Sequence, residues 1–151
     1  MPNNFTQDTS IAAWAKRCFF AGRAVMEAAL RPYDLGSTQW YVLHQLAKNG
    51  PTMQRELLRM LEVERATLSA IVSTLVRKGL IEQVPDHIDQ RQKLLRLTTV
   101  GTKLWAELPD LSFIHEMAFG EINDADLAVA IKVLRTATEH LNRILEKDTE
   151  A

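Results

Sequence analysis

The sequence predicts a mainly α-helical fold of about six helices with one small β-hairpin. Between residues 63 and 79 the apolar residues have the spacing of a helix with one buried face, at Leu68, Ile71, Val72, Leu75 and Val76. Two short apolar runs follow at 80–84 and 93–97, and the polar segment PDHIDQRQ joins them as the tip of a hairpin. Proline and glycine residues divide the rest of the chain into helical segments.

Three helices are expected before this region. The first runs from a Ser10 cap to about residue 30 and ends before Pro32. Ser37 is the expected cap of the second, which ends at Asn49-Gly50. The third covers about 53–61, and Thr52 is its only side-chain cap.

Further helices follow the hairpin. Thr98 is the expected cap of the fifth helix, and Pro109 predicts a kink or restart near 108–110. Asn123 begins a last helix that runs to about Glu146, with near-heptad apolar residues at 127, 131, 134, 141 and 145. Such a helix needs a partner, and the Ala-rich first helix of the same or a second chain is the expected one.

Composition predicts one globular domain. The chain has 151 residues, 46% hydrophobic and 25% charged, and no apolar run approaches the ~20 residues that span a bilayer. Its polar start, residues 1–9, is expected to be frayed and lacks the features of an export signal. One cysteine, Cys18, excludes an internal disulfide, so a cytoplasmic location is expected.

Charge is unevenly distributed along the chain. The net charge is −1, yet residues 52–103 carry nine basic and six acidic groups, while residues 104–151 carry four and ten. A phosphate backbone responds to local charge, so the middle of the chain is the candidate DNA-binding part.

The third and fourth helices are short and separated by a tight turn, which is typical of a helix-turn-helix. The face of the fourth helix opposite its apolar residues carries hydroxyl and guanidinium groups, at Arg65, Thr67, Ser69, Ser73 and Arg77. We therefore interpret it as a DNA-recognition helix and the hairpin after it as a wing.

With these elements assembled, the sequence resembles the MarR family (multiple antibiotic resistance regulators) of winged helix-turn-helix repressors over about residues 10–147. The most specific segment is DHIDQRQKLLRLT (86–98), against the family pattern D-P-x-D-R-R-x-K-L-V-x-L-T. LVRKGL (75–80) and TTVG (98–101) flank it in the family order. The resemblance implies a homodimer, with dimerisation helices in 10–35 and 110–147 and a winged helix-turn-helix region in 37–104 of a single domain, 1–151.

Four positions depart from the family pattern. Gln90 replaces the usual arginine, which is expected to weaken the phosphate contacts of the wing, and His87 replaces the usual proline. Glu62 stands at the glycine of the helix-turn-helix corner, so the turn is expected to differ slightly. Ala70 stands where many members carry a DNA-contacting arginine.

The first residues of a recognition helix contact base edges in the major groove. The candidates here are Arg65, Ala66, Thr67, Ser69 and Ser73. At the wing, Arg91 is expected to enter the minor groove, with its guanidinium held by a bidentate pair with Asp89. Expected phosphate contacts are Gln54, Arg55, Arg59, Lys93 and Arg96. The alternative for all of these residues is an ordinary solvated surface.

The resemblance also implies a pocket for a small aromatic or phenolic effector. Trp14, Arg17, Trp40 and His44 are the candidate lining, and the alternative is that both tryptophans belong to the core. Cys18 resembles the reactive thiol of the peroxide-sensing branch, although Met26 and Ser37 replace the tyrosines of that branch. A buried, inert cysteine is therefore the preferred interpretation.

Other classes have less support. The four histidines lack metal-ligand spacing, no cofactor motif is found, and no enzyme motif is recognised. The sequence therefore predicts a DNA-binding transcriptional regulator, specifically a repressor that binds an inverted-repeat operator as a homodimer and that a small molecule releases. Two alternatives stay open: a Cys18-based peroxide sensor, and a winged-helix adapter that binds protein instead of DNA.

Overall fold

The computed structural model describes residues 10–89 and 91–150. Residues 1–9 and Gln90, for which the sequence predicted a frayed start and a weakened wing contact, lie outside the described residues. The chain divides into two compact units, Met1–Leu111 and Ser112–Ala151, and each is described by itself.

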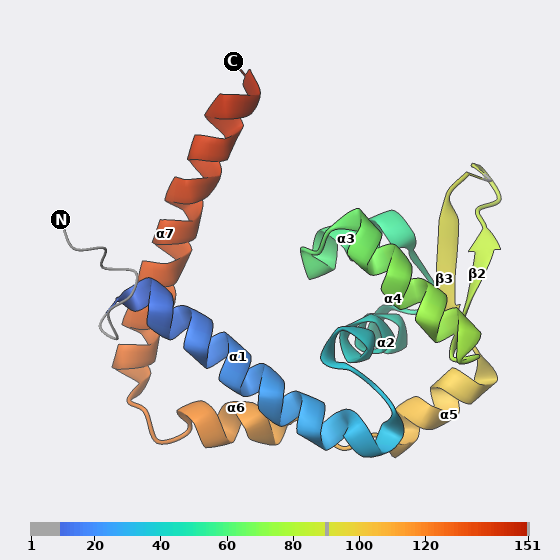
Figure 1. The fold of residues 1–151 in the computed structure, drawn as a ribbon, viewed down its shortest axis with the longest axis horizontal. Coiled ribbons are helices and arrows are strands. Elements are labelled where there is room, and N and C mark those ends of the chain that lie inside the picture. Colours follow the sequence, from blue (N-terminus) through green and yellow to red (C-terminus); the bar gives the residue numbers. More distant parts are fainter. Residues whose placement is uncertain (1–9, 90, 151) are drawn as a thin grey trace. The chain divides into compact units, whose positions relative to one another are not determined.

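The first unit contains five α-helices and a short 3-10 turn (Figure 1). They are α1 (Ile11–Leu30), η2 (Arg31–Tyr33), α2 (Ser37–Asn49), α3 (Gln54–Leu61), α4 (Arg65–Arg77) and α5 (Thr99–Glu107). Two predicted caps are confirmed: the Ser10 hydroxyl accepts from the Ala13 N–H at 3.1 Å, and the Thr98 hydroxyl accepts from the Gly101 N–H at 3.0 Å.

The cap predicted at Ser37 is wrong. Gly36 is the N-cap of α2 and Ser37 is its first helical residue. The Ser37 N–H donates to the Glu27 carboxylate of α1 at 3.0 Å. The Glu27 carboxylate, ten residues before Ser37, thus satisfies one of the N–H groups that have no partner within the first turn of α2.

The first unit also contains a three-stranded antiparallel sheet in the order β1-β3-β2, with β1 (Thr52–Met53), β2 (Ile81–Pro85) and β3 (Lys93–Leu97). The predicted hairpin is confirmed as β2 and β3, with Ile81 opposite Leu97. Strand β1 was not predicted, and the capping role expected of Thr52 is wrong. Thr52 is buried opposite Leu95 in the sheet, and Met53 precedes α3 instead.

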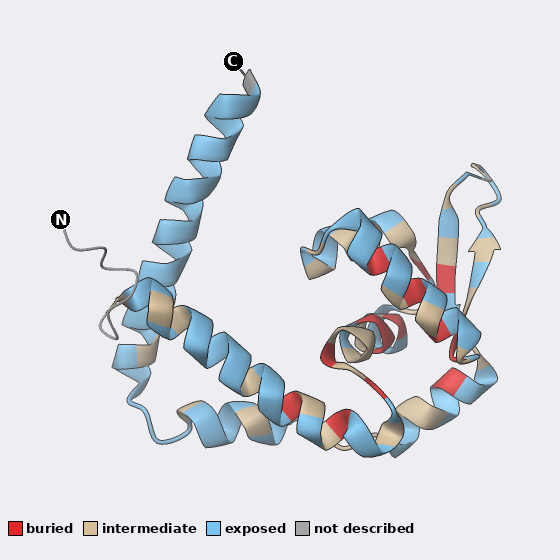
Figure 2. Ribbon diagram, in the orientation of Figure 1, coloured by how far each residue is buried: buried red, intermediate tan, exposed pale blue. Residues whose placement is uncertain are grey.

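The core of the first unit lies between the helices and this sheet (Figure 2). Its fully buried side chains are Leu30, Val42, Leu43, Leu57, Leu68, Val72, Leu75, Ile81 and Leu95. Helix α4 buries three of them, which confirms the predicted apolar face, although Val76 at its end is 38% exposed.

The turn between α3 and α4 adopts a conformation that favours glycine. Glu62 has φ 52° and ψ 40°, in the left-handed region. A side chain with a Cβ adopts this region at a cost of about 1–2 kcal/mol. A glycine at this position would adopt the same conformation without that cost.

Helix α5 begins in close contact with the segment between α4 and β2. The Thr98 N–H donates to the Leu80 carbonyl at 3.1 Å, and the Thr98 hydroxyl donates to the Gly79 carbonyl at 2.6 Å. A Cβ at Gly101 would lie 1.9 Å from the Leu80 carbonyl oxygen, so only glycine fits there.

The second unit contains α6 (Ser112–Phe119) and α7 (Asp124–Glu150). The predicted interruption at Pro109 is confirmed, and it makes seven α-helices among the described residues instead of about six. The Asn123 side chain accepts from the Ala125 N–H at 2.7 Å, and α7 continues to Glu150 instead of about Glu146.

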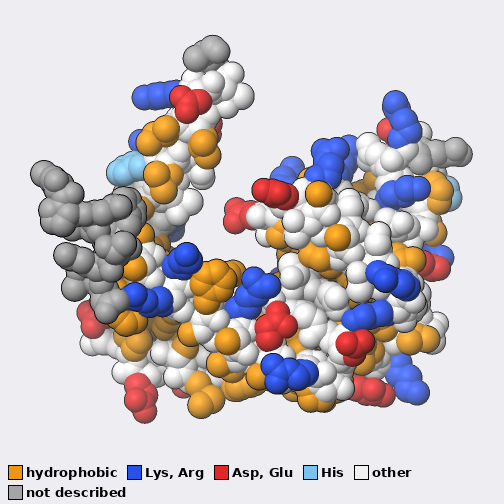
Figure 3. Space-filling model, in the orientation of Figure 1, with side chains coloured by type: hydrophobic (Ala, Val, Ile, Leu, Met, Phe, Trp, Pro, Cys, Tyr) orange, Lys and Arg blue, Asp and Glu red, His pale blue; other side chains and the backbone are white. Residues whose placement is uncertain are grey.

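Helix α7 has no buried residue in its described part, 124–149. Its exposed large apolar side chains, several of them visible as orange patches along the helix in Figure 3, are Val129, Ile131, Val133, Leu134, Leu141, Ile144 and Leu145. None of the described helices is both long and apolar enough for a membrane span.

Candidate nucleic-acid interface

The outer face of α4 carries the predicted base-contacting residues. Leu68, Val72 and Leu75 are buried, and the opposite face of the helix is exposed. All five predicted side chains lie on this exposed face: Arg65, Ala66, Thr67, Ser69 and Ser73. The face is built of short side chains, which allow a helix to approach a groove closely.

The start of α4 is electrostatically suited to an anion. Its first turn contains no acidic residue, and the N-cap Glu64 makes no side-chain capping hydrogen bond. The first N–H groups of the helix therefore have no cap from Glu64, and the macrodipole places partial positive charge there beside Arg65. A phosphate oxygen is a suitable acceptor at this position.

The wing tip is a folded loop. The Asp86 N–H donates to the Gln92 carbonyl at 3.1 Å, and the Gln92 N–H donates to the Asp89 carbonyl at 3.0 Å. The Asp89 N–H donates to the Asp86 carboxylate at 3.1 Å. These bonds hold Ile88, which is 95% exposed, at the end of the hairpin.

Arg91 projects from this loop, with its side chain 92% exposed. Its pairing with Asp89 differs from the predicted bidentate form. One carboxylate oxygen, Oδ1, accepts from the Arg91 backbone N–H at 3.1 Å and from its Nε at 3.2 Å. The contact thus orients the side chain from its base and holds the backbone at the same time.

The predicted phosphate contacts differ in their surroundings. Arg55 and Lys93 are exposed. Gln54 accepts from the Gln83 side chain of β2 at 3.1 Å. Arg59 pairs with Glu56, and Arg96 pairs across the strands with Glu82. Because a carboxylate already faces each of the last two guanidiniums, their attraction for phosphate is reduced.

Figure 3 shows several Lys and Arg side chains (blue) on the part of the surface that carries α3, α4 and the wing, with some Asp and Glu side chains (red) among them. This mixture agrees with the nine basic and six acidic residues of segment 52–103.

The predicted effector residues form two groups. On α2, the rings of Trp40 and His44 stack with centroids 4.8 Å apart. Trp105 of α5, which the sequence analysis missed, lies 5.5 Å from Trp40 and 5.7 Å from His44. Its only sequence signal was a third tryptophan in the helix after the wing.

The cluster of Trp40, His44 and Trp105 contains an unsatisfied donor. The Trp40 Nε1 is buried and has no hydrogen-bond partner among the described residues. A buried N–H without an acceptor costs about 1–3 kcal/mol, so a bound acceptor would be favoured there.

Trp14 and Arg17 form the second group, on the first half of α1. The Arg17 guanidinium carbon lies 5.0 Å from the Trp14 ring centroid. Trp14 is 57% exposed, so the alternative that it belongs to the core of this chain is wrong. Arg17 lies about 14 Å along the helix from the buried Met26, at 1.5 Å rise per residue, so this pair is well separated from the buried end of α1.

Cys18 is exposed, so its predicted burial is wrong in this chain. No group of three or more His, Cys, Asp or Glu side chains in the described ranges is arranged to hold a metal ion.

Comparison with known proteins gives one family. A model of the MarR family matches residues 33–92, which include α2, α3, α4, β2 and the wing loop. The transcriptional repressor NicR of Pseudomonas putida is 32% identical over 103 residues, which cover 68% of this chain and 65% of NicR.

Two solved structures have the same fold. A MarR mutant from E. coli, in complex with operator DNA, has a TM-score of 0.77 at 21% identity and covers 89% of this chain and 98% of that chain. BpsR of Bordetella bronchiseptica, whose DNA binding is regulated by 6-hydroxynicotinic acid, has a TM-score of 0.76 at 22% identity, with 91% and 98% covered.

Proposed function

We propose that the chain is a transcriptional regulator of the MarR family that binds double-stranded DNA in a sequence-specific manner, because the family model matches residues 33–92 and NicR is 32% identical over 103 residues. The observation that carries the proposal is the exposed face of α4 beside a folded wing with Arg91 at its tip. The relatives are transcriptional regulators, and no enzymatic role is proposed. A cytoplasmic location is proposed with it, because the protein must reach the DNA that it binds.

Helix α4 would lie in the major groove. The groove is about 12 Å wide and admits one helix, whose first residues contact base edges. Arg65 can donate two hydrogen bonds to guanine, and the Thr67 methyl can contact a thymine methyl. Ala66, Ser69 and Ser73 complete the surface. The exposed start of α4 would hold a phosphate next to the groove.

The wing would lie along the adjacent minor groove. Arg91 extends from the tip, and Asp89 restricts its orientation through two hydrogen bonds to one oxygen. A narrow minor groove concentrates negative potential, which favours an inserted guanidinium. Lys93 and Arg55 would contact the flanking phosphates.

A homodimer is proposed, formed by residues 10–35 and 110–147. Helix α1 exposes Ile11, Trp14, Phe19, Phe20 and Val25, and the second unit exposes the apolar side chains of α7. A single chain leaves these side chains in water, and a second copy would cover them. Two recognition helices about 34 Å apart then predict an inverted-repeat operator.

The proposed effector is a small aromatic acid that releases the repressor from DNA. The cluster of Trp40, His44 and Trp105 offers stacking rings and the unsatisfied Trp40 N–H for a carboxylate or hydroxyl oxygen. Arg17 and Trp14 are the candidate partners from α1, and the aromatic acid that regulates BpsR has matching chemistry. Cys18, although exposed, has no second feature that favours a redox role.

The test is the salt dependence of DNA binding by the full chain. A duplex selected from random sequence by the wild-type protein and a shuffled duplex of the same composition serve as probes. Arg91→Ala should weaken binding to both duplexes and reduce the slope of log affinity against log salt by about one. Lys103→Ala, which removes the same charge from an exposed position of α5 outside the proposed DNA contacts and dimer segments, should leave the slope unchanged.

An unchanged slope in Arg91→Ala would remove the wing from the interface. A wild-type protein that binds no duplex even at low salt would overturn the DNA-binding function and favour the protein-binding adapter.

A further inference from the structure

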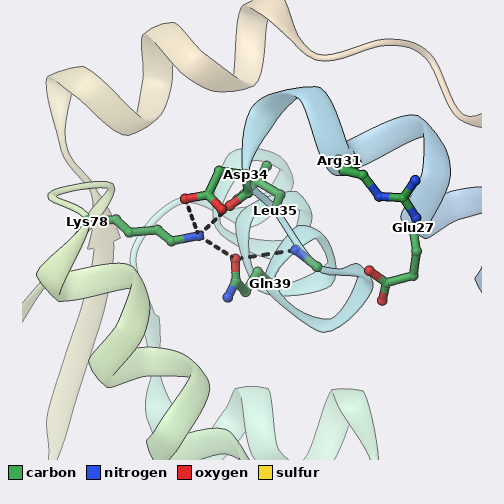
Figure 4. Close-up of a pocket in the computed structure, with 7 residues that line it drawn as sticks. Glu27, Arg31, Asp34, Leu35, Gln39 and Lys78 are labelled. Carbon is green, nitrogen blue, oxygen red and sulfur yellow. Dashed lines mark hydrogen bonds and ion pairs between the residues drawn. The ribbon is translucent and has the colours of Figure 1, made fainter.

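Lys78 connects the end of the recognition helix to the junction between α1 and α2 (Figure 4). It is the C-cap residue of α4, and its ammonium group contacts three oxygens. It donates to the Asp34 carbonyl, lies 3.5 Å from the Asp34 carboxylate, and donates to the Gln39 side-chain oxygen at 3.1 Å. Sequence separations of 39 and 44 residues lie between these partners, so the contacts join distant parts of the chain.

The partners of Lys78 are themselves held in place. Asp34 has φ 56°, and its N–H donates to the Arg31 carbonyl at 3.0 Å. Gln39 accepts from the Gly36 N–H at 3.4 Å with the same oxygen that accepts from Lys78. These contacts place the start of α2 and the end of η2 around one ammonium group.

Glu27 joins the same junction from α1. Its carboxylate accepts from the Ser37 N–H at 3.0 Å, and this hydrogen bond is the main cause that lowers the pKa of Glu27 below its ordinary value. Helix α1 is thus tied to the start of α2, and the start of α2 is tied through Gln39 to the end of α4.

We propose that Lys78 is a positioning residue for DNA recognition, which fixes the orientation of α4 relative to the α1–α2 junction. The inference rests on the proposed DNA-binding function. The core residues of α4 set which face it buries, whereas Lys78 acts at its C-terminal end. The side chain is 26% exposed, and its three oxygen partners occupy the donors that a phosphate contact would need.

A phosphate-contacting lysine and a positioning lysine have different signatures. Loss of a phosphate contact weakens binding to every duplex and lowers the salt slope by about one. Loss of a positioning contact leaves the phosphate contacts in place, so it lowers the preference for the selected duplex over the shuffled one.

The first experiment measures both quantities for Lys78→Met, which keeps the length of the side chain. Affinity for the selected duplex should fall about tenfold, the effect of losing one charge-assisted hydrogen bond. Affinity for the shuffled duplex and the salt slope should not change. Lys78→Arg should retain most of the preference, and Lys93→Met should weaken both duplexes together and lower the slope.

Gln39→Leu tests the same contact from the other side if Lys78→Met does not fold. It should lower the preference while Lys78 is retained. An unchanged preference in either variant, or a slope lowered by about one in Lys78→Met, would overturn the positioning role.

The second experiment needs no DNA, so it separates this inference from the proposed function. Hydrogen exchange of the wild-type protein and of Lys78→Met is compared at the amides of residues 34–39 and 75–80. Faster exchange of both segments in the variant supports the link. Equal exchange would overturn it, even if the wild-type protein binds DNA as proposed.

Discussion

Replacing Glu62 with glycine should stabilise the protein. Glu62 has φ 52° in the turn between α3 and α4, and its side chain is exposed. The left-handed conformation costs an L-residue about 1–2 kcal/mol. Glycine removes this cost but loses about 0.5–1 kcal/mol more backbone entropy on folding. The expected net gain in the free energy of unfolding is therefore about 0.5–1 kcal/mol.

The control for this prediction is Glu62→Gln, which removes the same negative charge and keeps the Cβ. Urea unfolding of both variants, followed by circular dichroism at one protein concentration, gives the comparison. For a chain of this size the gain corresponds to a rise of roughly 1–4 °C in the midpoint of thermal unfolding.

A Glu62→Gly variant no more stable than Glu62→Gln would refute the reasoning. It would mean that the left-handed turn carries no strain that the Cβ causes. A gain shared equally by both variants would instead assign the effect to charge.

Three further predictions concern packing, pH and the effector. Gly101→Ala should lower the free energy of unfolding by at least about 2 kcal/mol, because the new Cβ would lie 1.9 Å from the Leu80 carbonyl oxygen. Val100→Ala on the exposed side of the same helix should change it by no more than about 0.5 kcal/mol, and similar urea midpoints for the two variants would contradict this packing. The lowered pKa of Glu27 means that its ionised form stabilises the fold above the ordinary value of 4.5 and that this stabilisation is lost as pH falls below it. Glu27→Gln should therefore be less stable than wild type near neutral pH, and thermal midpoints that do not converge in acid would count against the capping bond. The third prediction uses an aromatic acid that the wild-type protein binds, found by calorimetry with a panel that includes 6-hydroxynicotinic acid, the regulator of BpsR. Trp40→Phe keeps a ring but removes the buried N–H, so it should bind that acid about tenfold more weakly than wild type. Tyr41→Phe should not, and equal affinities in all three proteins would exclude Trp40 as the donor.

Local periodicity was sufficient to predict most of the helices. In α4 the buried residues Leu68, Val72 and Leu75 follow directly from the spacing of apolar side chains. The wing was predicted because two apolar runs flank a polar loop. The exposure of the recognition-helix face follows from the same pattern, although its role on DNA is still a prediction.

Elements that depend on distant partners were missed. Strand β1 has two residues, too few to show a period, and it exists because it pairs with β3. The cap at Ser37 failed because Glu27 supplies the acceptor from another helix. Lys78 and Trp105 meet partners at large sequence separation, which no local pattern records.

The error at Cys18 has a different origin. A buried Cys18 was preferred because Met26 and Ser37 replace the tyrosines that accompany the reactive thiol, but of the residues of α1 only Met26 and Leu30, near its end, are buried in the single chain. The absence of those tyrosines bears on the reactivity of the thiol and does not show whether the side chain is covered.

The exposed apolar side chains of α7 predict that the stability of this fold depends on the protein concentration. Since the 27-residue helix has no buried side chain in its described part, a solitary polypeptide gains little from ordering it. Association of two copies would then contribute to the stability of the native state. By mass action, the melting temperature would rise as the protein concentration rises. A regulator that dimerises as proposed would then be least stable, and most open to proteolysis, where few copies are present.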